Sequence, residues 1–169
     1  MAAIAGRLLA NAPPRFALCG LSMGGYIAFE VMRQAPERVT RLALLDTGAK
    51  GATPETNKPR EQMISLAERG SYTEVTNLFW PRFVAPHRLD DSDLRATVRR
   101  MADETGPETF IRQQRAIMSR PDSRPGLGAI SVPTLVLVGE HDLATPVADS
   151  QEIADGIKGS RLVVLPGCG

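Results

Sequence analysis

The residues of this sequence with the clearest chemical potential are those of the pentapeptide Gly20-Leu21-Ser22-Met23-Gly24. An apolar run precedes the pentapeptide and an apolar pattern with helical spacing follows it, which predicts that Ser22 lies at a sharp turn between a strand and a helix. In that position the Ser22 hydroxyl is a candidate nucleophile. The backbone N–H of Met23, at the positive end of the helix, is a candidate donor to a developing oxyanion.

Three glycines surround the candidate nucleophile. So tight a turn brings the backbones of strand and helix together, so the positions beside it must carry almost no side chain. We expect Gly20 and Gly24 to supply this space, and Gly25 to allow a close approach of the helix to a strand. The motif therefore predicts a strained backbone at Ser22.

A second candidate group is Asp142, which ends the segment Val138-Gly139-Glu140-His141-Asp142. This segment directly follows an apolar run, so it is predicted at the carboxyl ends of the strands, the same edge as Ser22. An aspartate there can accept a hydrogen bond from a catalytic histidine and fix the tautomer of that histidine. Glu140 and Asp46, which follows the preceding apolar run, remain the alternative acids.

The sequence contains two histidines, and neither is well placed to serve Ser22 as a general base. His141 adjoins Asp142 in one loop and is expected to point elsewhere. His87 lies in a helical region far from both residues in the sequence. Without a base, a serine hydroxyl stays protonated near neutral pH and is a poor nucleophile. The residues thus predict a nucleophile and an acid without a base between them.

Composition excludes several classes of protein. Lysine and arginine number 20 against 19 acidic residues, a net charge of +1, which gives no general reason to expect a nucleic acid or an anionic membrane as a partner. The basic pair Arg99-Arg100 is expected on the solvated face of a helix. Two cysteines, Cys19 and Cys168, make no disulfide framework, so a cytoplasmic location is the default expectation. Cys19 is expected to pack inside a strand.

The N-terminal residues 1–12 are too short and too interrupted by charge for a membrane span, and they lack the layout of a signal peptide. No cluster of ligands has metal-binding spacing, so neither a metal nor a cofactor is expected. A chain of 169 residues that is 43% hydrophobic can bury a core of its own.

Apolar patterns alternate between strand and helix spacing at both ends of the sequence, which indicates an α/β fold. The expected strands are 15–19, 39–45, 134–138 and 161–165. The expected helices are 3–10, 23–34, 59–69, 72–80, 91–104, 107–118 and 146–157. Strands joined by crossover helices make a parallel sheet, and we expect this one to be buried on both faces.

The chain is accordingly predicted to have three parts: a sheet part at 1–47, a helical cap insertion at 48–128 and a second sheet part at 129–169. An insertion between consecutive strands can fold over the carboxyl edge of the sheet and enclose a pocket. Its aromatic residues either line such a pocket or pack the helices of the insertion against one another. They are Phe79, Trp80, Phe83 and Phe110.

These motifs resemble those of the α/β-hydrolase superfamily along nearly the whole chain. Phe16–Glu30 is similar to the nucleophile elbow of that family with its following helix, and Val132–Pro146 is similar to the strand that bears the triad acid. Arg161–Gly169 resembles the strand after which the family places its histidine. Met23 and the glycines behind it are similar to the esterase, lactonase and cofactor-free haloperoxidase branches. The resemblance implies a partial α/β-hydrolase parallel sheet with a helical cap.

The resemblance also implies an activity: hydrolysis of small-molecule carboxylic esters or lactones through an acyl-enzyme. Ser22 would be the nucleophile, Asp142 the acid and the Met23 N–H an oxyanion donor. The family's histidine would follow Gly169, and several strands would precede Phe16, so we expect a chain truncated at both ends that is inactive by itself. The alternatives are a receptor-like binding fragment and an acyltransferase on the same fold. The oligomeric state stays open.

Overall fold

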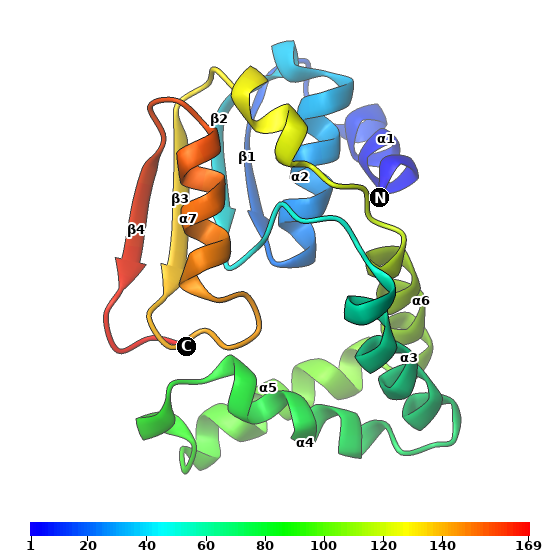
Figure 1. Ribbon diagram of the computed structural model, residues 1–169. Helices are drawn as coiled ribbons and strands as arrows, with labels where there is room; N and C mark the ends of the chain where they lie inside the picture. Colours follow the sequence, from blue (N-terminus) through cyan, green and yellow to red (C-terminus); the bar gives the residue numbers. More distant parts are fainter.

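The computed structural model describes residues 1–169, and it contains a parallel sheet whose four strands pair in the order β1-β2-β3-β4 (Figure 1). The strands are β1 Phe16–Leu21, β2 Val39–Leu45, β3 Thr134–Gly139 and β4 Arg161–Leu165. The helices are α1 Ala2–Asn11, α2 Met23–Gln34, α3 Pro54–Glu68, α4 Tyr72–Phe83, α5 Ser92–Thr105, α6 Pro107–Met118 and α7 Val147–Gly156. Short 3-10 helices lie at η1 Pro36–Arg38, η2 Pro86–Arg88 and η3 Arg124–Ala129. None of the helices has both the length and the apolar character needed to cross a membrane.

The register of the sheet aligns the carboxyl ends of its strands. Leu21 of β1 pairs with Leu45 of β2, and Leu45 pairs with Leu137 of β3. The parallel ladder continues one residue beyond β1 and β2, because Ser22 N donates to Leu45 O and Asp46 N donates to Leu137 O, each at 2.9 Å. These bonds fix Ser22 and Asp46 side by side at one edge of the sheet.

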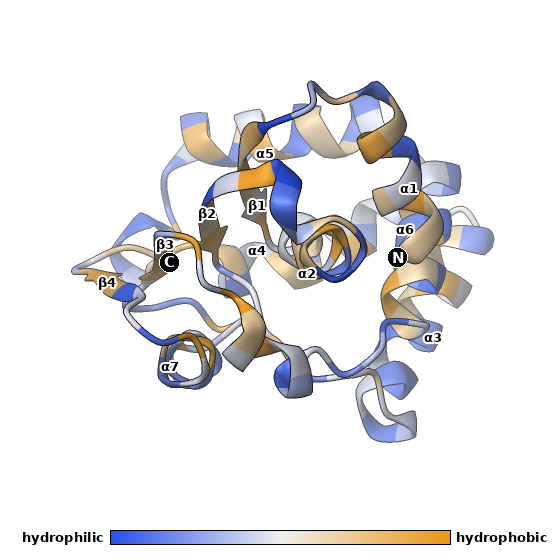
Figure 2. Ribbon diagram, turned by 90° about the horizontal axis from the view of Figure 1, so that it is seen from above, coloured by the Kyte–Doolittle hydropathy of each residue, from blue (hydrophilic) through white to orange (hydrophobic).

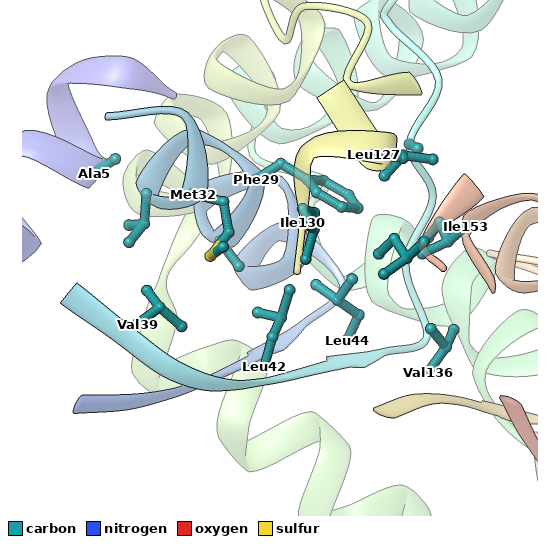
Figure 3. Packing of buried hydrophobic residues seen from close by; sticks show 14 residues of the cluster. Ala5, Phe29, Met32, Val39, Leu42, Leu44, Leu127, Ile130, Val136 and Ile153 are labelled. Atoms are coloured by element: carbon teal, nitrogen blue, oxygen red, sulfur yellow. The ribbon is translucent and has the colours of Figure 1, made fainter. Parts of the chain in front are cut away.

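The hydrophobic core lies on one face of the sheet. Alternate residues of each strand point to the same face, and here those of β2 and β3 meet the apolar sides of α2, η3 and α7 (Figure 3). The residues with no more than 2% exposure in this cluster include Ala28, Val31, Val39, Leu42, Leu44, Val136, Ile153 and Ile157. The core therefore anchors α2, the helix that follows Ser22, to the centre of the sheet.

The opposite face of the sheet is not buried, so the expectation of a sheet covered on both faces is wrong. Seen along the strands, α2 and α7 lie on the same side (Figure 2). On the other side Ala17, Cys19 and Arg41 are exposed and border an open groove across β1, β2 and β3. Cys19 is consequently accessible rather than packed in a strand. Small and apolar side chains on this face made it look buried in the sequence.

The segment between β2 and β3 consists of helices, with α4 and α5 beyond the carboxyl ends of the strands (Figure 1). It has a second apolar cluster of its own, in which Ala67, Val75 and Phe110 are buried. A separate cluster in a continuous segment supports our proposal that residues 48–128 form a cap unit.

Helix α3 of this segment begins earlier than expected. Thr53 caps its first turn, and Thr53 and Thr56 exchange the two hydrogen bonds of a capping box. The expected range of 59–69 therefore omitted the start of α3, which continues through Pro59.

Candidate active site

Ser22 occupies a sharp turn between β1 and α2. Its backbone has φ 50° and ψ −112°, in the left-handed region that non-glycine residues rarely adopt, so the expected strain is present. Such a conformation costs about 1–3 kcal/mol and persists only where its surroundings impose it. Here the Ser22 carbonyl accepts from Gly25 N at 2.9 Å and from Thr47 Oγ1 at 2.8 Å, while its N–H is held by Leu45. Neighbouring elements thus fix the turn on both sides of Ser22.

Two of the three surrounding glycines are required by space. A Cβ atom at Gly20 would collide with the backbone of Gly24 and Gly25, and a Cβ at Gly25 would collide with the side chain of Thr47. A Cβ at Gly24 would meet nothing within 4 Å, so the expectation that Gly24 supplies space for the turn was wrong. The close contact is between α2 and Thr47, two residues after the end of β2, and Gly25 faces Thr47.

The Ser22 hydroxyl is available for chemistry. Serine at a helix N-cap usually accepts a hydrogen bond from the first turn, but Ser22 makes no such bond and its side chain is exposed. Met23 begins α2, so its N–H is one of the donors that have no partner within a helix. A hydroxyl and a free N–H therefore lie together at the positive end of the helix dipole.

Asp142 lies in the loop between β3 and α7 and is 7% exposed. Its Oδ1 accepts from Ala144 N at 2.7 Å and from Thr145 N at 2.8 Å, and its Oδ2 accepts from Thr145 Oγ1 at 2.6 Å. A carboxylate has about four acceptor sites. These bonds fill both sites of Oδ1 and one site of Oδ2, which leaves one acceptor site on Oδ2 for a further N–H donor.

The two alternative acids are occupied with structural contacts. Asp46 has φ 43°, and its Oδ1 accepts from Gly139 N at 3.1 Å, which links the ends of β2 and β3. Burial raises the pKa of the Asp46 carboxyl; the Gly139 N–H opposes this shift, and the charge of Asp142 adds to it. Glu140 is exposed, and its Oε2 accepts from Gly167 N at 2.9 Å, which fastens the C-terminal segment.

A cavity of about 350 Å³ opens at Ser22. Ser22 and Met23 line it from the turn, and Thr145, which binds the Asp142 carboxylate, lines it from the loop after β3. Thr145 thus links the Asp142 carboxylate to the wall of the cavity, which Asp142 itself does not line. The remaining wall comes mainly from α4, α5 and α6.

The aromatic residues of the insertion fulfil both roles considered for them. Phe79 stacks on Phe83 with ring centroids 5.0 Å apart and meets Phe110 edge-on at 6.2 Å. The same three residues line the Ser22 cavity. Trp80 does not, because it is buried and donates from Nε1 to Leu89 O at 3.1 Å.

Neither histidine lines the Ser22 cavity. His141 Nε2 lies 3.8 Å from Glu140 Oε2, and His87 lies in η2 beside Gly167. The sequence expectation that neither points at Ser22 agrees with this arrangement. No group of three or more His, Cys, Asp or Glu side chains lies close enough together to hold a metal ion.

Thr47 and Thr145, which hold the backbone of Ser22 and the carboxylate of Asp142, were not identified from the sequence. Thr145 carries a detectable signal, since a threonine three residues after an aspartate in a loop is typical of a turn closed by that aspartate. Thr47 carries none, because its partner is 25 residues away.

Known proteins resemble this chain in sequence and in structure. Residues 3–169 match the model of the α/β hydrolase fold family. A pimeloyl-[acyl-carrier protein] methyl ester esterase from Nitrosomonas europaea is 30% identical over 93% of the chain and 65% of its own length. An esterase from Thermogutta terrifontis superposes with a TM-score of 0.86 and 31% identity over 99% of the chain and 61% of the esterase. The enol-lactonase from Burkholderia xenovorans LB400 superposes with a TM-score of 0.82 and 30% identity over 96% of the chain and 62% of the lactonase.

The chain belongs to the α/β-hydrolase fold family. Its parallel sheet with flanking helices is a partial version of that fold, and the relatives it resembles carry the names of hydrolases, among them esterases and enol-lactonases. The chain spans between 54% and 65% of the length of the curated relatives it matches.

Proposed function

We propose that Ser22 is the nucleophile of a hydrolase that cleaves small-molecule carboxylic esters or lactones. The observation that carries the proposal is the strained turn at Ser22, whose uncapped hydroxyl lies at a cavity beside a free helix N-terminus. Strain of this kind is maintained by specific contacts with Thr47 and Leu45. The esterases and enol-lactonases among the relatives support this reaction class.

In the proposed reaction an imidazole removes the proton from Ser22 Oγ, which bonds to the carbonyl carbon of the substrate. The Met23 N–H donates to the resulting oxyanion. The tetrahedral intermediate collapses, the bond from carbon to the leaving oxygen breaks, and the imidazolium returns the proton to that oxygen. Water then releases the acyl group from Ser22 by the same steps. Asp142 accepts the imidazole N–H through the free site on Oδ2.

The 169 residues themselves hold no histidine at the Ser22 cavity. We therefore propose that the isolated chain hydrolyses esters at no more than a trace rate, and that added imidazole partly restores activity by occupying the space between Ser22 and Asp142. Loss of a histidine base typically costs several orders of magnitude in rate.

The test is hydrolysis of 4-nitrophenyl acetate by the chain with increasing imidazole. Because imidazole cleaves this ester without protein, Ser22→Ala serves as the matched background. The wild-type rate is expected to exceed the Ser22→Ala rate only in the presence of imidazole, and Asp142→Asn is expected to reduce the excess. Equal rates for the wild type and Ser22→Ala at every imidazole concentration would contradict the proposal. A Ser22-dependent rate without imidazole would contradict only the proposed inactivity of the isolated chain. His87 or His141 would then have to be considered as the base.

A further inference from the structure

A cluster of three arginines lies beside the Ser22 cavity. Arg60 of α3, Arg82 of α4 and Arg120, just after α6, line one cleft of about 700 Å³. They come from separate elements, so no local sequence pattern reveals them as a group. Arg120 is positioned by its bonds to the carbonyls of Lys50 and Ile117 and by the ring of Tyr26, whose centroid lies 4.8 Å from its guanidinium carbon.

None of these three arginines has an acidic partner. Arg60 donates to the neutral Gln114 Oε1 at 2.6 Å, and Arg82 donates to the carbonyl of Leu143 at 3.1 Å. The other cations of the cleft are neutralised: Lys50 Nζ lies 2.8 Å from Asp149 Oδ1, and Arg124 forms an ion pair with Asp122. The unbalanced positive charge of the cleft is thus that of the three arginines.

Bringing these cations together without a counter-ion is unfavourable. Burial lowers the pKa of Arg60; Tyr26 opposes this shift, and the charges of Arg120 and Arg82 add to it. Groups held against such repulsion are typical of a site whose counter-ion arrives with a ligand. Guanidinium groups match a carboxylate especially well, because their paired N–H donors bind its two oxygens together.

The cluster is continuous with the proposed reaction site. Arg60 lines both the cleft and the Ser22 cavity, and so do Tyr26, Phe79 and Thr145. A ligand whose carbonyl lies at Ser22 can therefore extend past Arg60 into the cleft. The Ser22 side is lined mainly by aromatic and aliphatic side chains and the far side by cations, so the expected ligand is apolar in its middle and anionic at its end.

We propose that Arg60, Arg82 and Arg120 form a carboxylate subsite, and that the preferred substrates are esters or lactones bearing a free carboxylate at the end remote from the cleaved bond. The reaction part of this proposal rests on the function proposed for Ser22, whereas the binding part does not.

The test is ligand-observed NMR titration of the chain with monomethyl glutarate and monomethyl suberate, each compared with its dimethyl ester. Each pair has the same carbon skeleton and differs in one negative charge. We expect at least one half-ester to bind about tenfold or more tightly than its diester, the gain expected of a charge-assisted pair. Sodium chloride should weaken binding of the half-ester and leave the diester unchanged.

Variants assign the effect to the cluster. Arg60→Gln and Arg82→Gln are each expected to weaken binding of the half-ester about tenfold with no change for the diester. Arg112→Gln removes the same charge from an exposed position of α6 outside the cleft, and it should leave both affinities unchanged. If circular dichroism shows that Arg60→Gln is unfolded, the test rests on Arg82→Gln, because Arg82 is exposed and its substitution is not expected to disturb the fold.

Ser22→Ala separates this proposal from the previous one, since it removes the hydroxyl and no charge. Half-ester binding that survives Ser22→Ala and depends on Arg60 or Arg82 supports the subsite even if imidazole restores no hydrolysis. Equal affinity for half-ester and diester, no binding of either, or equal loss in Arg112→Gln and Arg82→Gln would overturn the subsite and leave the role of Ser22 to its own test.

Discussion

Alanine substitutions at the three glycines around Ser22 should change the free energy of unfolding in different directions, although the sequence places all three glycines in one motif. Gly20→Ala puts a Cβ against the carbonyl of Gly24 and the nitrogen of Gly25. Both are backbone atoms of the turn and of α2, which the core holds in place, so neither can move aside cheaply. Overpacking typically costs about 1–3 kcal/mol, and for Gly20→Ala we expect the upper end, about 3 kcal/mol.

Gly25→Ala should be destabilising for a different reason. The new Cβ meets the side chain of Thr47, which is fully buried and donates to the carbonyl of Ser22. Displacing Thr47 adds the loss of one hydrogen bond, about 1 kcal/mol, to the overpacking. The higher helix propensity of alanine offsets up to about 1 kcal/mol of this cost, so we expect the free energy of unfolding to fall by about 1–3 kcal/mol in total.

Gly24→Ala is the matched control. It lies in the same turn of α2 with no atom within 4 Å of the new Cβ, so only the helix propensity changes. We expect an increase in the free energy of unfolding of about 0.5–1 kcal/mol.

The assay is thermal and urea unfolding followed by far-ultraviolet circular dichroism. For a chain of this size, 1 kcal/mol corresponds to about 2–4 °C in Tm. Gly20→Ala should therefore lower Tm by roughly 6–12 °C, whereas Gly24→Ala should raise it by about 1–4 °C. Equal destabilisation by Gly20→Ala and Gly24→Ala would refute the packing described for the turn.

Two further substitutions probe the carboxylates at the sheet edge. Burial holds the folded-state pKa of Asp46 above its ordinary value of 3.8. Ionisation of Asp46 therefore destabilises the folded chain fully at a pH above the folded-state pKa, and not at all at a pH below 3.8. Asp46→Asn, which keeps an acceptor for Gly139 N, should raise Tm at pH 7 by an amount that shrinks as the pH falls toward 3.8; a lower Tm at pH 7 would contradict this. Thr145→Val removes the hydroxyl bonded to Asp142 and should reduce the free energy of unfolding by about 1.5–3 kcal/mol in urea titrations. Thr40→Val, which removes a bond to a neutral carbonyl, should cost only about 0.5–1.5 kcal/mol, and equal losses would contradict a charge-assisted bond at Asp142.

The sequence predicts the features that depend on neighbouring residues. The strained turn at Ser22 follows from glycines within two positions of it, and the positions of β3 and the Asp142 loop follow from one apolar run. The assignment of Gly24 failed because its outcome depends on which side of α2 faces Thr47, a residue on another element. The pattern of glycines is the same whichever side faces the sheet.

Features that depend on distant elements were missed for the same reason. Arg60, Arg82 and Arg120 come together only when α3 packs against α4 and α6. The sequence instead drew attention to Arg99-Arg100, where Arg99 pairs with Asp103 at 3.1 Å on an exposed helix, as expected of a solvated face. The exposed face of the sheet was missed because Ala17 and Cys19 are the residue types that buried strands also contain.

The central claim, that Ser22 is the nucleophile, is tested most directly by locating the acyl group. The chain is incubated with 4-nitrophenyl acetate and imidazole, digested with trypsin and analysed by tandem mass spectrometry. Cleavage after Arg15 and Arg33 yields one peptide that contains Ser22 with Cys19 and Tyr26 as competing nucleophiles and no lysine. We predict acetylation at Ser22 that requires imidazole and is absent from Ser22→Ala. Acetyl groups on Cys19 or Tyr26 alone, or none on this peptide at any imidazole concentration, would contradict the claim.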